Sequence, residues 1–286
     1  MNNVPGSGAK WLDVSAMRFA GWVSGFASRH GDAGSLAAAP AGRAVAFTAQ
    51  DGTVAECHPP FAESFALPAG LADPDEVAAA IAAHAQVPRA VGVLLVRLGG
   101  YAAGVFTGYP PALADAKVGS RLVHGRSAAG GWSQHRFARR REKQANEALE
   151  AAAGTAAAVF GRWTSRITAT GAPALGGTAP APGNTAPAPA RVPRATSRGG
   201  DSRIRSESGP AAAGAGAAGR GSRLDAVVLG GDKRAMAELR NDPRLAPYLA
   251  IATERFLTVP DPKRAVLEGT PRLFTAVRIK VAEPSS

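Results

Sequence analysis

The spacing of hydrophobic and polar residues divides the chain into helix-like and strand-like segments. Apolar residues at helical spacing predict helices over 11–29, 74–86, 133–154 and 232–242. Strand-like patterns predict a hairpin over 43–57 around Asp51-Gly52, and strands over 91–98, 102–109, 117–126, 224–231 and 273–281. The first of these single strands is almost wholly apolar, which is typical of a strand buried on both faces.

The order of these segments predicts an α/β (α+β) fold with one mixed sheet and helices packed on it. Residues 167–222 differ from the rest, because they are rich in Ala, Pro, Gly and Arg and almost lack large apolar side chains. Such a stretch cannot bury enough apolar surface to offset the entropy of ordering, so we expect it to be disordered. We therefore expect an N-terminal segment with an amphipathic helix (1–31) and one domain split between 32–166 and 223–286.

Charge and cysteine content narrow the classes of function. The chain has 33 Lys and Arg against 22 Asp and Glu, a formal net charge of +11. Clustered arginines in so basic a chain predict an anionic partner, with nucleic acid as the first candidate. Cys57 is the only cysteine, so a disulfide within the chain and a cysteine-based metal centre are excluded, and we expect a buried thiol. No apolar run reaches the ~18 residues of a membrane span, so we expect a cytoplasmic protein without membrane contact.

Residues 124–154 hold the candidate site. Gly130 and Gly131 allow unusual backbone angles and close approach to a partner, and Gln134 follows them. Glutamine is not a general base at neutral pH, but its amide donates and accepts hydrogen bonds together and can position a hydroxyl or a water. Cationic residues of the following helix share one stripe at 100° per residue: Arg136, Arg139, Arg140 and Lys143. Positive charge at the start of a helix opposes the helix dipole, which favours an RNA-binding face. A surface turn that only caps the helix is the alternative reading of these residues.

A triplet, a pair of glycines and an arginine-rich helix follow one another in this segment. The residues concerned are His124-Gly125-Arg126, Gly130-Gly131, Arg136-Phe137-Ala138-Arg139, Arg141 and Glu142-Lys143. Their order resembles the central domain of the eukaryotic and archaeal peptide-chain release factors, which carries HGR, then GGQ, then an RFARLR-like helix. Trp132 stands where those factors have their glutamine, and Gln134 lies two positions later. A displaced glutamine is what the release-factor-like VLRF group of ribosome quality control shows, and this chain resembles the bacterial members of that group.

The resemblance implies a peptidyl-tRNA hydrolase that works at the peptidyl-transferase centre, against the rRNA of the large ribosomal subunit. Gln134 would orient a water at the peptidyl ester or stabilise the leaving ribose hydroxyl, while Gly130 and Gly131 let the loop enter an RNA cavity. RNA contacts would come from Arg126, Trp132, Ser133, Arg136, Arg139, Arg140 and Lys143. Trp132 would stack on a base or else pin the loop to the domain, and His124 would be structural or a second catalytic group.

Within the same resemblance, three activities stay open. The first is ester hydrolysis by a ribosome rescue factor, and the second is an endonuclease that releases the peptide with the tRNA terminal nucleotides. The third is a tRNA- or ribosome-binding module without catalysis. The chain has no spare length for a codon-recognition domain, so rescue is expected rather than termination. We further expect a monomer that needs no metal and no cofactor.

Overall fold

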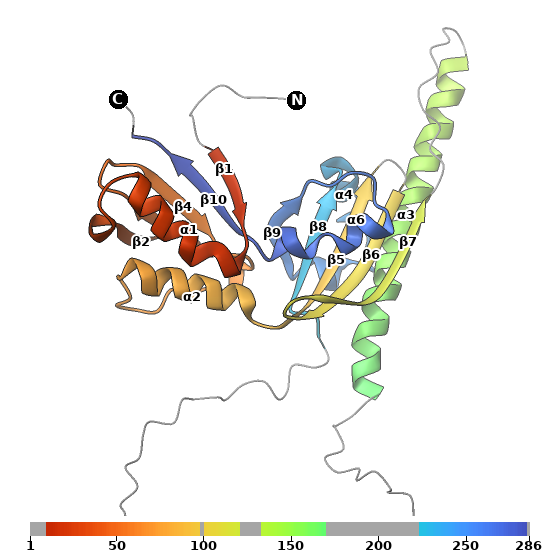
Figure 1. Ribbon diagram of the computed structural model, residues 1–286. Coiled ribbons are helices and arrows are strands. Elements are labelled where there is room, and N and C mark those ends of the chain that lie inside the picture. The colour runs from red at the N-terminus through yellow and green to blue at the C-terminus, as the bar shows by residue number, and fades with distance from the viewer. Residues whose placement is uncertain (1–9, 98–99, 121–132, 170–222, 285–286) are drawn as a thin grey trace, which may run out of the picture.

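The strands form two sheets that lie side by side, with helices packed against them (Figure 1). The structure is a computed structural model, and it describes residues 10–97, 100–120, 133–169 and 223–284. The predicted disordered insertion lies outside the described residues apart from its first three positions, which continue a helix. The α/β class with helices on a mixed sheet is confirmed, and a second sheet of antiparallel strands stands beside it.

The antiparallel sheet joins the two ends of the chain. Its strands, in spatial order, are β1 (Lys10–Val14), β10 (Val277–Ala282), β4 (Val54–His58), β3 (Ala44–Thr48) and β2 (Ala37–Ala41). The helical elements of this part are α1 (Ala16–Arg29), η1 (Ala33–Ser35), η2 (Ala62–Ser64) and α2 (Pro74–Gln86). The predicted hairpin is confirmed as β3 and β4. Helix α2 has the predicted bounds, because Asp73 caps it by accepting from the backbone N–H of Asp75 and Glu76 and Pro74 takes its first position.

One face of this sheet is covered by α1 and α2, and a core forms between them. Phe19 and Phe26 of α1 and Ile81 of α2 are fully buried against Phe47 and Ile279 of the sheet. Cys57 belongs to the same core, so the expected buried thiol is confirmed. Burial raises the pKa of the Cys57 thiol far above its ordinary value, which keeps it protonated and unreactive.

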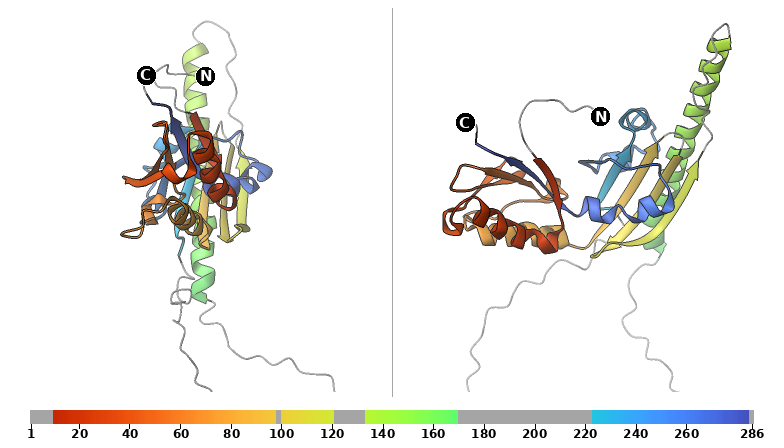
Figure 2. Two further views of the ribbon diagram at one scale, coloured as in Figure 1. Left: turned by 60° about the vertical axis from the view of Figure 1, so that its left-hand side comes forward. Right: turned by 45° about the horizontal axis from the view of Figure 1, so that its top comes forward.

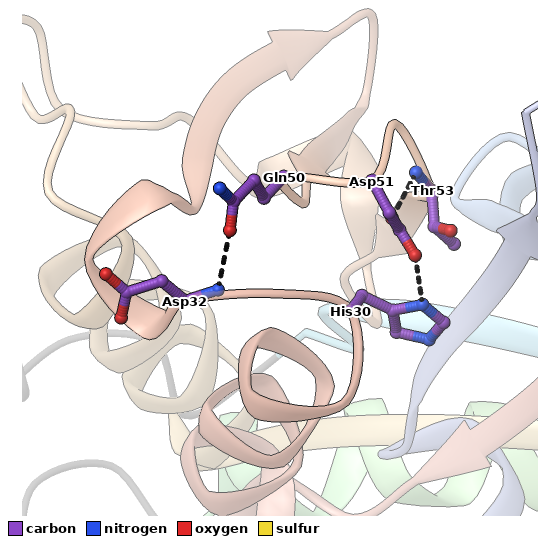
Figure 3. A network of polar contacts seen from close by, with 5 residues as sticks. All are labelled: His30, Asp32, Gln50, Asp51 and Thr53. Atoms are coloured by element: carbon purple, nitrogen blue, oxygen red, sulfur yellow. Dashed lines mark hydrogen bonds and ion pairs between the residues drawn. The ribbon is translucent and has the colours of Figure 1, made fainter.

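A polar network ties the end of α1 to the β3–β4 hairpin (Figure 3). His30 Nδ1 lies 2.9 Å from a carboxylate oxygen of Asp51, and the other oxygen of Asp51 accepts from the Thr53 backbone N–H at 2.8 Å. Next to this pair, the backbone N–H of Asp32 donates to the side-chain oxygen of Gln50 at 2.9 Å. The backbone N–H of Thr53, with His30 second, lowers the pKa of Asp51 below its ordinary value of 3.8.

This lowered pKa predicts an acid-sensitive contribution to folding stability. The folded-state pKa of Asp51 is below the unfolded value, so the contribution is fully present above pH ~3.8 and is lost as pH falls through the folded-state pKa. Thermal melting of the wild type and of Asp51→Asn, from pH 6 down to pH 2, measures it. The two melting curves should differ at pH 6 and converge in acid, and a difference that is constant with pH would contradict the assignment.

The mixed sheet carries helices on both faces. Its strands, in spatial order, are β7 (Ala112–Ser120), β6 (Gly100–Gly108), β5 (Arg89–Arg97), β8 (Ala226–Gly231) and β9 (Ala252–Leu257). The first three pair antiparallel, whereas β5, β8 and β9 run parallel. The helices are α3 (Ser133–Ala169), α4 (Lys233–Leu239), α5 (Ala246–Leu249), α6 (Arg264–Glu268) and α7 (Pro271–Phe274). β5 precedes residues 170–222 and β8 follows them, so both sides of that segment enter one sheet.

Both faces of the mixed sheet are therefore buried, as the apolar run 91–98 predicts. Leu94 and Val96 of β5 face the core under α3, while Val93 and Leu95 face the core under α6 and α7. The chain turns sharply from β8 into α4 at Gly231, whose φ is +103°. A side chain at that position would collide with the backbone of Val96, so only glycine fits.

Polar contacts join the two sheets through β9. The guanidinium of Arg255 donates to Asp13 of β1 at 2.6 Å and to the carbonyl oxygen of Ala276 at 2.6 Å. Beside it, the backbone N–H of Glu254 donates to the Glu63 carboxylate at 2.8 Å. By these two hydrogen bonds Arg255 of β9 holds β1 and Ala276, the residue before β10, against the mixed sheet.

Four element boundaries differ from the sequence predictions. Residues 10–14 form β1, so the first helix starts at Ala16 and not at residue 11. The strand predicted over 117–126 starts earlier, at Ala112, because it pairs along the length of β6, and residues 121–126 lie outside the described residues. The segment 273–281 divides into the short helix α7 and β10, and Phe274 points into the core from that helix. The predicted helix 133–154 continues to Ala169, because residues beyond Gly154 pack against the mixed sheet.

Candidate functional site at the start of helix α3

The structure places the predicted glutamine in the first turn of α3. The helix begins at Ser133, as predicted, and Gln134 is its second residue. Arg136, Arg139, Arg140 and Lys143 follow along the helix. The remaining predicted site residues lie outside the described residues: His124, Arg126, Gly130, Gly131 and Trp132.

The lower part of α3 is fixed to the mixed sheet by small side chains. Buried residues repeat along one side of the helix, namely Ala148, Ala152, Ala153, Ala156, Val159 and Phe160. Alanines let the helix approach the sheet closely, and Phe160 meets Tyr248 edge to face with ring centroids 5.1 Å apart. This apolar side continues on both sides of Gly154, so tertiary packing carries the helix past the glycine that the sequence marks as its end.

A bidentate ion pair also attaches α3 to strand β7 of the mixed sheet. Arg162 donates from Nε and from a terminal nitrogen to the two carboxylate oxygens of Asp115 on β7, at 3.1 and 3.2 Å. The Asp115 side chain is only 13% exposed, so the pair is shielded from solvent on the carboxylate side. Together with the apolar contacts, it fixes the orientation of the helix on the sheet.

The upper part of α3 is a stalk, by which we mean residues 133–147. None of the described side chains from Glu142 to Glu147 is buried, and Ala148 is the first that is. At 1.5 Å per residue, the fifteen residues of the stalk rise about 22 Å. Figures 1 and 2 show the helix running well beyond the edge of the mixed sheet at this end. The first turn, with Gln134, is thereby held away from the body of the protein.

The stalk is cationic. It carries five Lys and Arg residues against Glu142 and Glu147, and its first turn has no acidic residue. At 100° per residue the positions of Arg136, Arg139 and Arg140 fall on the side opposite to the packed alanines. The positive end of the helix dipole adds to this charge. A helix end of this kind attracts phosphate groups.

The rest of the described chain offers little competing chemistry. No group of three or more His, Cys, Asp or Glu side chains in the described ranges is arranged to hold a metal ion. His58 and Cys57 are neighbours on β4, but Cys57 enters the core and His58 lies on the opposite face, as alternation along a strand requires. Among the described residues, no helix is long and apolar enough to span a membrane.

Sequence reasoning missed the ion pair that orients α3 and the one that joins the two sheets. Asp115 and Arg162 are 47 positions apart, and Arg255 and Asp13 are 242 apart. No local spacing links the members of either pair. The alternation of β7 is the only sequence signal, since it places Asp115 on one defined face of the sheet.

Comparison with known proteins completes this picture. No curated protein matches the chain. The sequence profile of a family described as "Actinobacteria/chloroflexi VLRF1 release factor" matches residues 89–280, which is more than half of the chain. The match starts at the first residue of β5 and takes in the whole mixed sheet, the stalk and most of β10. The chain belongs to the actinobacterial and chloroflexi VLRF1 release factor family.

Proposed function

We propose that this protein is a peptidyl-tRNA hydrolase that frees the nascent peptide on stalled large ribosomal subunits. Its family consists of release factors, whose place of action is the ribosome. The observation that supports the proposal is the start of α3 at Ser133, with Gln134 in the first turn of a cationic stalk that runs beyond the edge of the mixed sheet. An extended tip of this kind suits a group that must enter a cavity walled by RNA.

The residues of the site take distinct roles in this proposal. The Gln134 amide orients a water for attack on the ester carbonyl or stabilises the leaving ribose hydroxyl. Gly130 and Gly131 let the loop approach the RNA closely, and Trp132 stacks on a base. Phosphate contacts come from the cationic residues Arg126, Arg136, Arg139, Arg140 and Lys143, with Ser133 beside them. Such contacts position the protein without reading sequence.

The proposal also covers the organisation of the chain. We propose that residues 32–166 and 223–286 form the release-factor-like catalytic domain, which 167–222 interrupts. The parallel pairing of β5 with β8 supports this, because it brings both sides of the interruption into one sheet. The protein would act as a cytoplasmic monomer on peptidyl-tRNA and the rRNA of the peptidyl-transferase centre.

One assay distinguishes this function from its two alternatives. The purified protein is incubated with large ribosomal subunits carrying labelled peptidyl-tRNA, and both the peptide and the tRNA 3′ end are inspected. Free peptide with intact tRNA is the expected result. Peptide still joined to terminal nucleotides would show an endonuclease, and binding without any release would show a module that only binds tRNA or the ribosome.

A second experiment tests the cationic stripe. We expect the double substitution Arg139→Ala/Arg140→Ala to weaken binding to these subunits and to reduce the slope of log K against log salt by about two, since each phosphate contact contributes about one. Fluorescence titrations from low to high salt measure it. The double variant Arg234→Ala/Arg240→Ala removes two exposed charges from the α4 region and serves as the matched control. Equal slopes for the two double variants would remove the stalk from the RNA contact.

A further inference from the structure

The antiparallel sheet has a second face, opposite to α1 and α2. Alternation along β1, β10 and β4 sends every other side chain to this face, and strand pairing sets them in rows. One row is Trp11, Lys280 and Glu56, and the other is Asp13, Arg278 and His58. None of them belongs to the core under α1 and α2. In the described part of the chain, Figures 1 and 2 show no helix lying on this face.

An exposed aromatic platform stands on this face. Trp11 is 46% exposed, although tryptophan is usually well buried. The Arg278 guanidinium lies 4.4 Å from the centroid of its ring, and the His58 ring lies 5.5 Å from it at a tilt of 38°. Burial lowers the pKa of His58, with Glu56 opposing and Arg278 reinforcing the shift, so its ring is neutral near pH 7. Three planar groups from three strands are thus gathered in one place.

The charge around the platform is positive. Arg255, Arg278 and Lys280 bring three positive charges to this face against the two carboxylates of Asp13 and Glu56, and Asp13 is paired with Arg255 at 2.6 Å. Within the described ranges, Arg278 and Lys280 form no salt bridge. Lys280 lies between Trp11 and Glu56 in its row, whereas Lys10, the neighbour of Trp11 on β1, belongs to the opposite face. Arg278 and Lys280 therefore lie beside the aromatic group and are available to an anionic partner.

We propose that this face, defined by Trp11, Arg278, His58 and Lys280, binds single-stranded RNA. An unpaired base stacks on the Trp11–Arg278 pair, and a neighbouring phosphate lies against Lys280. A sheet surface with an aromatic group and two cations beside it fits a splayed base better than it fits a duplex, whose bases are stacked inside. The site is separate from Gln134 and goes beyond the proposed hydrolysis, and residues 1–88, which carry Trp11, lie outside the family match.

The test compares two probes of about ten nucleotides, a length within the usual site size of such surfaces. One is oligouridine, and the other is the same ribose-phosphate backbone without bases. Their difference in affinity reports base stacking and cancels the phosphate contacts made elsewhere on this basic chain. We expect the full-length wild type to prefer oligouridine by at least about fivefold, the lower bound for one stacked base.

Variants then assign the preference to this face. Trp11→Leu keeps an apolar side chain on β1 and should reduce the preference to within about twofold, whereas Trp11→Tyr should retain most of it. Arg278→Ala should reduce it as well. Met17→Leu and Arg18→Ala change exposed residues of α1 and should leave it unchanged. Circular dichroism and thermal melting check that each variant is folded, and Arg278→Ala decides the matter if Trp11→Leu is not.

Three results would overturn the proposal. The first is a wild type that binds both probes equally, and the second is a folded Trp11→Leu or Arg278→Ala that keeps the full preference. The third is equal loss of affinity for polyglutamate and for oligouridine in Trp11→Leu, which would mean that the face recognises acidic protein and not bases. Peptide release by these variants is measured in parallel, and failure of the Gln134 site alone would leave the probe preference intact.

Discussion

Gln134→Ala is expected to slow peptide release by about 10²–10³-fold, the range seen when one preorganised polar group is removed from a reacting centre. The glutamine amide donates and accepts hydrogen bonds together and stays neutral at every working pH, so it can position a water or a hydroxyl. Affinity for large subunits carrying peptidyl-tRNA should change by no more than about twofold, because in the proposed function the phosphate contacts of the cationic stripe would dominate binding. Single-turnover release and binding titrations measure the two quantities separately.

Asn146→Ala is the matched control for this substitution. Asn146 presents the same kind of side-chain amide on the same helix, is exposed, and lies twelve residues below Gln134. Its removal should leave the release rate within about twofold of wild type, since it is remote from the tip. A Gln134→Ala protein that releases peptide at the wild-type rate would show that the reacting centre lies elsewhere.

Asn146→Pro is expected to reduce release by about 100-fold through geometry alone. Residue 146 lies just above Ala148, where the contact of α3 with the sheet begins. Proline there removes the backbone hydrogen bond to residue 142, clashes with that turn and costs the helix about 3 kcal/mol. The stalk should kink or fray while the packed part of the helix stays in place, so Gln134 would no longer be aimed at the ester.

The proline variant needs a measurement that distinguishes a displaced Gln134 from an unfolded protein. Melting of the mixed sheet should remain cooperative, because the buried contacts from Ala148 to Phe160 lie below the substitution. Asn146→Ala at the same position keeps the helix and should keep the rate. If the proline variant releases peptide as fast as the alanine variant, a rigid stalk is not required for the reaction.

Much of the fold could be predicted from local sequence patterns. The β3–β4 hairpin follows from Asp51-Gly52, helix α2 from its cap at Asp73 and Pro74, and β5 from its continuous apolar run. These elements carry their own boundary signals. The class of fold follows from their order.

The elements that could not be predicted depend on distant partners. β1 is a strand because it pairs with β10, some 265 residues later, although its residues also fit the helical spacing of α1. Helix α3 passes Gly154 because Thr155, Ala156 and Phe160 are buried beyond it. In both cases a contact between remote segments outweighs a local preference.

The candidate site divides in the same way. The residues proposed for the chemistry are close in sequence, since the glycines, Gln134 and the arginines fall within about ten positions, and the predicted start of the helix at Ser133 agrees with the bounds of α3. Its placement is not local, since the small residues under α3 and the Arg162–Asp115 pair bring together segments that no spacing connects. The structure adds the stalk, which the sequence presents only as a long helix.

The most direct test of the proposed hydrolysis follows the oxygen of the attacking water. Release is run in water enriched in ¹⁸O with large subunits carrying peptidyl-tRNA, and the products are weighed by mass spectrometry. Hydrolysis of the ester transfers one water oxygen to the peptide carboxylate and leaves the ribose hydroxyl on an intact tRNA, and this is the result we predict for the wild type. Peptide that carries terminal nucleotides and no ¹⁸O in its carboxyl group, or the absence of any released peptide, would contradict it.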